Sequence, residues 1–392
     1  LIEVDIVMDR KAEYSINRGF SLVEVMVALV IGLLAMIVIL QVFSLSEGSK
    51  RTSTSGSDAQ QNGSMALFTI ERDLRQAGYG MISLPALGCT INGFDQGPPA
   101  RSITGLGLQL APVVITQGGA GAPDGIAITY SGSEDVGRIA TLKSVNNGNN
   151  SNYQVWDNSG FNDASNIGNL ILVVESGNPR CTLAEINSNV GSGSDNIIHN
   201  PGANNPRFNV ASGVGVTHQP GSLIINLGSL PGANNYTVTV PSAAVPSGQL
   251  NRQNSIMEAV PTPIVDGVVN LQAEYGMDDG VNDGSIAHTT YVAGDKIVDH
   301  WTTLNPTTPT AWSQVVAIRL AVLARSGLRE KPNRATGQCT TTTTVPTWAS
   351  TNANSVFSNS GALPSDADGT SWKCYRYRVY ETTVPLRNMI WQ

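Results

Sequence analysis

The sequence predicts an α+β protein in which a long N-terminal helix, transmembrane in its first half and amphipathic in its second, packs on an antiparallel β-rich globular domain. Three observations lead to this prediction. A continuous apolar run extends from Phe20 to Phe43, and helical periodicity returns between residues 60 and 78. From residue 81 onward, short apolar runs alternate with turn formers, and the chain contains 40 Gly and 20 Pro, as expected for a loop-rich β protein.

The apolar run is long enough to cross a membrane. The residues from Phe20 to Phe43 would make a helix of about 36 Å, whereas a bilayer core is roughly 30 Å thick. A secretory signal peptide has a shorter apolar region that ends at a small-residue cleavage site, and residues 41–45 offer none. Arg10, Lys11 and Arg18 precede the run. We therefore expect a cytoplasmic N-terminus and one inner-membrane span at residues 20–43.

Glu24 is the one ionisable residue inside this run. A carboxylate within a span is unfavourable unless it reaches the interface or finds a positively charged partner. One alternative is that Glu24 lies near the cytoplasmic interface and contacts water. The other is that cleavage after Gly19 creates an α-amino group on Phe20, whose pKa of about 8 keeps it mostly protonated at neutral pH. In a neighbouring subunit, that ammonium would pair with Glu24 and fix the axial register.

Residues 18–24, Arg-Gly-Phe-Ser-Leu-Val-Glu, resemble the signal of type IV prepilins. In that signal Gly precedes the cleaved bond, Phe follows it, and Glu is the fifth residue of the mature chain. The resemblance implies cleavage by prepilin peptidase between Gly19 and Phe20. It also implies N-methylation of Phe20 by the same enzyme and a role for Glu24 in subunit assembly.

The same resemblance makes residues 1–19 a cleaved prepilin leader. Two starts of this leader remain open, Leu1 and Met8. A start at Met8 would leave a short basic leader of the ordinary kind. Detection of a peptide spanning Leu1 to Asp9 in the uncleaved precursor would establish the longer form.

Residues 44–79 are predicted to form a periplasmic helical stem. Four apolar residues fall three or four positions apart and so share one helical face: Leu67, Ile70, Leu74 and Ala77. This face is expected to dock on the protein's own domain, and Gly78 suits the position that ends a helix. Three poor helix formers predict a bent or partly melted helix between residues 44 and 63: Gly48, Gly56 and Gly63.

Three segments narrow the resemblance to one family. Residues 61–79 and the closing segments 315–326 and 377–388 are similar to those of PilW-type minor pilins, relatives of the J-type minor pseudopilins of type II secretion. The resemblance covers about residues 18–80 and 260–392, and it implies the type IV pilin fold. It further implies a structural subunit that joins a minor-pilin complex, primes type IV pilus assembly and sits at the filament tip.

The family also implies partners and a location. The partners are prepilin peptidase, other minor pilins, the major pilin and, before assembly, inner-membrane lipid. The location is the inner membrane, with a periplasmic globular domain, and then the pilus at the cell surface, where such filaments serve twitching motility and cell adhesion. Two other roles remain open: a tip adhesin or DNA-uptake subunit that uses residues 81–260, and a minor pseudopilin of a type II secretion system.

The composition argues against other classes of function. Only 14% of the residues are charged and the formal net charge is −7, so no broad basic face is available and no nucleic acid partner is expected. The sequence lacks the G-x-S-x-G, H-E-x-x-H and G-x-x-x-x-G-K motifs of common active sites. We therefore expect no enzymatic activity.

The β-rich domain is predicted over residues 80–392, with loop insertions in its divergent middle. Its expected strands include Gly125–Tyr130, Asn169–Glu175, Ser222–Leu227 and Tyr236–Val240. The apolar density of Val315–Ala324 indicates a central strand. Alternation in Tyr375–Val384 indicates a strand with one wet face.

Four cysteines, Cys89, Cys181, Cys339 and Cys374, lie outside any C-x-x-C pair or zinc-ligand spacing. Two disulfides are therefore expected in the oxidising periplasm. Three connectivities are open, and the pairing Cys89–Cys181 with Cys339–Cys374 is favoured, because the second bond would close a polar loop that has little else to hold it.

Oxygen ligands gather in one short segment, which includes Asp278, Asp279, Asn282 and Asp283. Such a set could hold a structural Ca²⁺ ion, which takes six to eight oxygens. The spacing is not that of an EF-hand, and an Asp/Gly-rich hairpin turn is the favoured alternative. No other cofactor is expected.

Overall fold

The computed structural model describes residues 19–391 with internal gaps, so the predicted leader and both of its starts lie outside the described residues. The gaps are residues 82–86, 120, 134–137, 149–150, 189–193, 202–203, 211–215, 285, 287–289, 334, 351–355, 358–362 and 364–370. The chain forms two compact units, Leu1–Thr54 and Ser55–Gln392.

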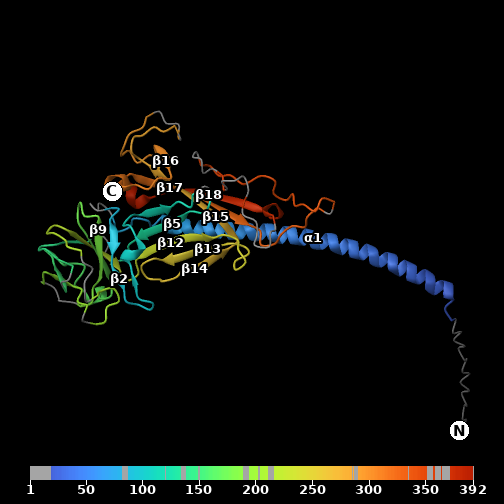
Figure 1. Ribbon diagram of the computed structural model, residues 1–392, viewed down its shortest axis with the longest axis horizontal. Coiled ribbons are helices and arrows are strands. Elements are labelled where there is room, and N and C mark those ends of the chain that lie inside the picture. Colours follow the sequence, from blue (N-terminus) through green and yellow to red (C-terminus); the bar gives the residue numbers. More distant parts are fainter. Residues whose placement is uncertain are drawn as a thin grey trace, which may run out of the picture. The chain divides into compact units, whose positions relative to one another are not determined.

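Helix α1, Leu22–Leu74, has 53 residues and is continuous (Figure 1). Of the two alternatives predicted between residues 44 and 63, a bent or a partly melted helix, the partly melted one was therefore wrong. The helix is continuous even though each glycine in a helix interior costs about 1 kcal/mol relative to alanine. The helix also ends four residues before Gly78. Residues 75–80 form a turn in which Gly78 has φ +76° and its N–H donates to the carbonyl oxygen of Thr129.

The second unit contains two antiparallel sheets that pack on each other and on the second half of α1 (Figure 1). The first has the order β14-β13-β12-β5-β4 and consists of Thr262–Asp266, Gln249–Asn254, Gly232–Thr239, Gly125–Tyr130 and Val113–Thr116. The second has the order β16-β15-β17-β18 and consists of His300–Thr302, Val268–Met277, Val315–Arg325 and Tyr377–Pro385. The short helices are α2 (Pro309–Ser313) and α3 (Arg387–Ile390).

A third sheet and two strand pairs are built mostly from the middle of the chain. The third sheet has the order β1-β9-β8-β11-β6 and consists of Thr90–Asn92, Arg180–Glu185, Leu170–Val174, Leu223–Gly228 and Ile139–Thr141. The pairs are β7 (Asn152–Gln154) with β10 (Asn196–Ile198), and β2 (Phe94–Asp95) with β3 (Arg101–Ser102). Short 3₁₀ turns occur at Thr104–Leu106, Ala164–Asn166 and Trp372–Cys374. The strands of this third sheet and of the two pairs form an inserted layer, whereas β4 and β5, which lie in the same stretch of sequence, belong to the first sheet.

These elements confirm the predicted α+β class, with a long N-terminal helix followed by a β-rich domain. Strand β5 has the predicted bounds, and β8, β11 and β12 overlap the expected strands. Strand β17 is flanked by β15 and β18, as its apolar density predicted. Strand β18 alternates between exposed and partly buried residues, as expected for a strand with one wet face.

The stem half of α1 buries its predicted stripe. Ile70, Leu74 and Ala77 are fully buried, together with Ala66, while Leu67 is partly buried against the same cluster. Each large apolar side chain buried in this way contributes about 1.5–3 kcal/mol. The stripe joins the main core, to which β12, β15 and β17 also contribute.

The inserted sheet lies between two cores. Every residue of β8 is buried, because its unbroken apolar run faces apolar partners on both sides. Leu170, Leu172 and Val174 join the main core, whereas Ile171 and Val173 join a smaller second core. The residues that β7, β10 and their flanks add to the second core are Tyr153, Val155 and Ile197.

The structure contains the two favoured disulfides. Cys89–Cys181 joins the residue before β1 to β9, with a Cα–Cα distance of 5.8 Å. Cys339–Cys374 closes a loop between residues 35 positions apart. Crosslinks over such separations stabilise a fold by roughly 4 kcal/mol in the chain-entropy account.

Candidate assembly site

The predicted processing site precedes α1. Gly19 and Phe20 are exposed and outside the helix, and the Phe20 side chain is 81% exposed. The helix then starts at Leu22, where the N–H of Val25 donates to the carbonyl oxygen of Ser21. A peptidase that must reach the Gly19–Phe20 bond finds accessible, non-helical backbone here.

Glu24 lies in the first turn of α1 and is exposed. Residues 24, 28, 32 and 36 are spaced by four, so they share one stripe of the helix surface. Together with Phe20, Val25, Leu29 and Leu33 they line a shallow groove of about 520 Å³. The carboxylate of Glu24 is the one charged group in an otherwise apolar groove.

The groove has small residues at its centre. Ala28 and Gly32 are four positions apart, and a Cβ atom added to Gly32 would meet nothing within 4 Å. Small residues at this spacing allow two membrane helices to approach closely. The groove can therefore receive another helix, with Glu24 at one end of the contact.

The other end of the helix is fixed within the second unit by Asp73. Asp73 is buried, and its Oδ2 accepts hydrogen bonds from the hydroxyl of Tyr236 at 2.6 Å and from the amide of Asn234 at 2.7 Å. Burial, together with the hydrogen bond to Asp73, raises the pKa of Tyr236 well above its usual range. The side-chain amide of Asn388, in α3, donates to the carbonyls of Gln76 and Ala77 just beyond the helix.

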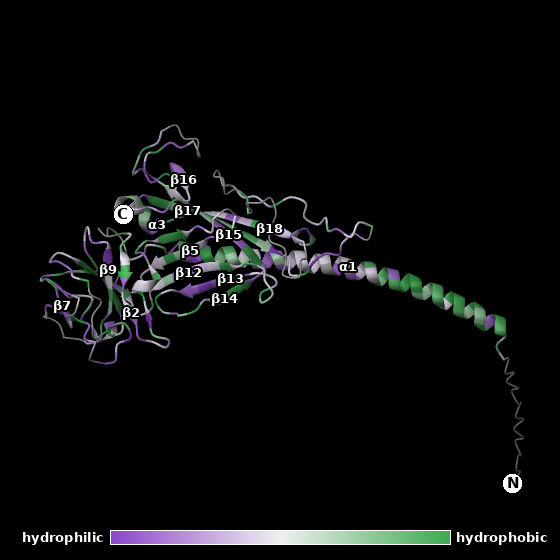
Figure 2. Ribbon diagram, in the orientation of Figure 1, coloured by the Kyte–Doolittle hydropathy of each residue, from purple (hydrophilic) through white to green (hydrophobic). Residues whose placement is uncertain are grey.

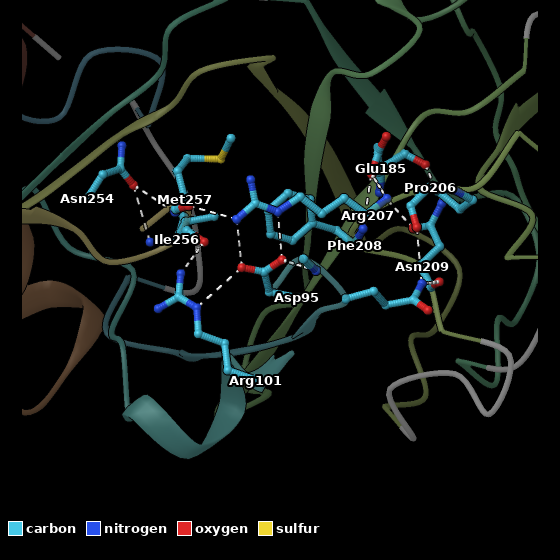
Figure 3. Close-up of polar contacts among 12 residues, drawn as sticks. Asp95, Arg101, Glu185, Pro206, Arg207, Phe208, Asn209, Asn254, Ile256 and Met257 are labelled. Atoms are coloured by element: carbon cyan, nitrogen blue, oxygen red, sulfur yellow. Dashed lines mark hydrogen bonds and ion pairs between the residues drawn. The ribbon is translucent and has the colours of Figure 1, made fainter. Parts of the chain in front are cut away.

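Asp95 organises a second polar cluster, between the inserted layer and the first sheet (Figure 3). Arg207 donates to both of its carboxylate oxygens, at 2.6 and 2.8 Å, and Arg101 donates at 3.2 Å. Burial would raise the pKa of Asp95, but hydrogen bonds from Arg207, the N–H of Gly97 and Arg101 outweigh it and lower this pKa.

The two arginines of this cluster also hold the connection between β13 and β14. Arg101 donates to the carbonyl of Ile256 at 2.6 Å, and Arg207 to that of Met257 at 2.7 Å (Figure 3). The insertion is thereby attached to the first sheet by charged hydrogen bonds. This cluster could not be predicted from a sequence motif, because Asp95 and Arg207 are 112 positions apart.

The carboxylates predicted to bind calcium are engaged with the protein's own donors. Asp278 is buried, and its oxygens accept the N–H groups of Gly294 at 2.6 Å and Lys296 at 2.9 Å. Asp279 lies 3.2 Å from Nδ1 of His300. These contacts fit a hairpin that is held by its own side chains.

The remaining two predicted ligands, Asn282 and Asp283, are exposed. Within the described ranges, no group of three or more His, Cys, Asp or Glu side chains is placed to hold a metal ion. Calcium binding stays a prediction, which a thermal melt of the full chain in Ca²⁺ and in chelator would test.

Two protein families match this chain at its opposite ends. The prokaryotic N-terminal methylation motif matches residues 15–40, and the family described as type IV pilus-assembly protein W matches residues 235–388. The second match starts within β12 and ends within α3, so it leaves out the inserted layer.

One solved structure and the curated proteins complete the comparison. A type IV-like pilin from Thermus thermophilus is 10% identical, with 84% of this chain and 97% of that chain covered and a TM-score of 0.30. No curated protein matches the chain. The methylation motif over residues 15–40 and the pilus-assembly match over residues 235–388 confirm the predicted resemblance of this chain to type IV minor pilins of the PilW type.

Proposed function

We propose that this chain is cleaved between Gly19 and Phe20, methylated on Phe20 and built into a type IV pilus as a minor subunit. The observation that carries the proposal is the groove on α1, which Glu24 and the small pair Ala28 and Gly32 line together with the exposed Phe20 just before the helix. The N-terminal methylation motif spans this same face.

Cleavage supplies a positively charged partner for Glu24. The new α-amino group on Phe20 keeps its positive charge after methylation, because an N-methylated amine remains protonated at neutral pH. The ammonium of one subunit would meet Glu24 of a neighbouring subunit at the same depth in the membrane. The dielectric constant is low there, so opposite charges attract strongly. Pairs of this kind fix how far one helix is shifted along the next.

The same subunit would join a complex of minor pilins, prime polymerisation of the major pilin and remain at the filament tip. The inserted layer, built from the third sheet and the two strand pairs, supports a terminal position, because a bulky insertion is accommodated most easily where a subunit has neighbours on one side only. The matching family is described by pilus assembly, which favours a pilus over a type II secretion system.

The test replaces Glu24 with Val and with Gln, and compares both with Glu47→Gln. Glu47 is an exposed carboxylate of the same helix outside the groove, so it controls for loss of a charge alone. We expect all variants to reach the membrane and to be cleaved. Both Glu24 variants should disappear from sheared filaments, while Glu47→Gln should be incorporated normally.

Normal incorporation of Glu24→Gln would show that the charge is not needed and would refute the pairing role. A normal pilus in cells that lack this chain, combined with a defect in protein secretion, would move it to the pseudopilins.

A further inference from the structure

An exposed tryptophan lies on the outermost layer of the insertion. Trp156 follows β7 and is 68% exposed. The backbone N–H of Trp156 donates to the carbonyl oxygen of Thr141, and Leu142 forms an antiparallel β-bridge with Val155. The chain after β6 therefore pairs antiparallel with the chain after β7. Figure 2 shows β7 at the outer margin of the second unit, beyond β9.

Alternation makes this layer two-faced. Tyr153 and Val155 point into the second core, whereas Gln154 and Trp156 are exposed between and beyond them. An indole left in water forgoes the free energy that burial would give it, about 25 cal/mol for each Å² of apolar surface. The inward face of the layer is complete without Trp156, so core packing does not account for this residue.

The indole ring is held in place from one side. The ammonium of Lys143 lies 5.0 Å from the centroid of the Trp156 ring and 2.8 Å from a carboxylate oxygen of Asp195. This is within the range of a cation–π contact. Lys143 thus orients one face of the ring, and its charge is balanced by that of Asp195. Trp156 remains mostly exposed to solvent.

The chain that carries Trp156 is anchored in the second core by Tyr153. Tyr153, fully buried, stacks on His199 with centroids 4.2 Å apart. Burial lowers the pKa of His199 to about 4, so this ring is neutral at physiological pH. A fixed aromatic side chain loses little conformational entropy when it binds a ligand.

Amide side chains share the exposed face with the tryptophan. Gln154 and Asn196 are directly opposite each other in the β7–β10 pair. Asn152 donates to the side-chain oxygen of Asn196 at 2.6 Å, and the Gln154 side-chain oxygen accepts from the hydroxyl of Ser144 at 3.0 Å. These hydrogen bonds orient the amides, and each amide has both donor and acceptor capacity.

We propose that this face, with Trp156 at its centre, binds a neutral carbohydrate. One face of a pyranose ring consists of C–H bonds and can lie flat on an indole, while its hydroxyl groups match amides that both donate and accept hydrogen bonds. The neutral balance of Lys143 and Asp195 gives no preference for an anionic ligand. Protein–protein contacts have few such charged and polar groups at their centre.

The inference is independent of the filament role, and its test uses the purified full chain in a detergent without a sugar headgroup. The probes are lactose, maltotriose, cellotriose, chitotriose and mannotriose, each titrated calorimetrically, with a sulfated disaccharide as the anionic comparison. We expect saturable binding of at least one neutral sugar and none of the sulfated one.

Trp156→Ala should weaken that binding by about tenfold or more, equivalent to about 1.4 kcal/mol, and Trp156→Phe by less. Trp391→Ala is the matched control, because Trp391, the residue that follows α3, is also an exposed tryptophan (81%) and lies outside the proposed binding face. It should bind as the wild type does, and all three variants should keep the wild-type melting temperature.

Three results would overturn the proposal: no saturable binding of any neutral sugar, equal affinity of Trp156→Ala and wild type, or tighter binding of the sulfated disaccharide. A fourth would reassign the face to a second copy of the chain. In that case the wild type would sediment as a dimer, Trp156→Ala as a monomer, and neither would bind sugar.

Discussion

The two halves of α1 are one continuous helix with opposite surface chemistry. From Leu22 to Phe43 the large apolar side chains are exposed, and the ribbon of this half is coloured mainly as hydrophobic (Figure 2). From Ser55 onward, polar residues return and the apolar ones form a stripe that is buried within the second unit. The first half has an 18-residue window of mean hydropathy 3.0, none of it buried.

This difference shows which partners each half needs. A helix that is apolar all round is stable in lipid or among other helices, whereas an amphipathic helix is stabilised by one core. The stem can therefore fold with its own domain. The first half needs lipid or neighbouring subunits around it. Substitutions in the second half should therefore change the stability of the domain, and substitutions in the first half should change incorporation into filaments.

Removing Asp73 should have the largest effect on the folded domain. Asp73→Ala leaves the hydroxyl of Tyr236 and the amide of Asn234 buried without their acceptor, at a cost of about 3 kcal/mol in the free energy of unfolding. Glu71→Gln is the control, because its ion pair with Arg75 is exposed and contributes less than about 0.5 kcal/mol. Urea unfolding of the full chain measures both.

A double-mutant cycle with Tyr236→Phe sharpens that prediction. If Asp73 acts through Tyr236, the two substitutions together should cost clearly less than the sum of their separate effects. Additive losses would show that Asp73 stabilises the stem in another way.

Gly63 and Gly32 form a matched pair across the two halves. A Cβ atom at Gly63 would lie 2.2 Å from the ring of Tyr380 and 3.0 Å from the Cβ of Ala324. Gly63→Ala should therefore lower the stability of the domain by about 1–3 kcal/mol through overpacking. A melting temperature equal to that of the wild type would mean that the Tyr380 ring moves aside freely.

Gly32→Ala should have the smallest effect on stability. Its Cβ meets nothing within 4 Å, and alanine favours the helix by about 1 kcal/mol relative to glycine, so the domain should melt as the wild type does. Incorporation into filaments is the sensitive measurement, because the added methyl group fills the groove next to Ala28. Loss of domain stability with Gly32→Ala would contradict the separation of the two halves.

The sequence was sufficient for features that depend on neighbouring residues. The apolar run, the stripe through Ile70 and Leu74, and the alternation in β18 all follow from local periodicity. The partly melted alternative for the stem was wrong, and packing accounts for this at Gly63, where the Tyr380 ring approaches the helix; Gly48 and Gly56 have no such neighbour within 4 Å.

Long-range contacts could not be predicted in this way. Asp73 meets Tyr236 across 163 positions, and Asp95 meets Arg207 across 112. Neither carboxylate is part of a motif, although Asp73 stands one position from Leu74 in the buried stripe, which is a detectable signal. The exposure of Trp156 was detectable too. Tyr153, Gln154 and Val155 alternate between apolar and polar, and this alternation puts Trp156 on the polar face with Gln154.

Processing of this chain into a filament subunit is tested most directly by N-terminal mass spectrometry of the protein from sheared pili, and from membranes of cells that lack prepilin peptidase. We expect a filament form that starts at N-methyl-Phe20 and a membrane form that still carries Arg18 and Gly19. An unprocessed chain in the filaments, or cleavage after Phe43 in either sample, would contradict it.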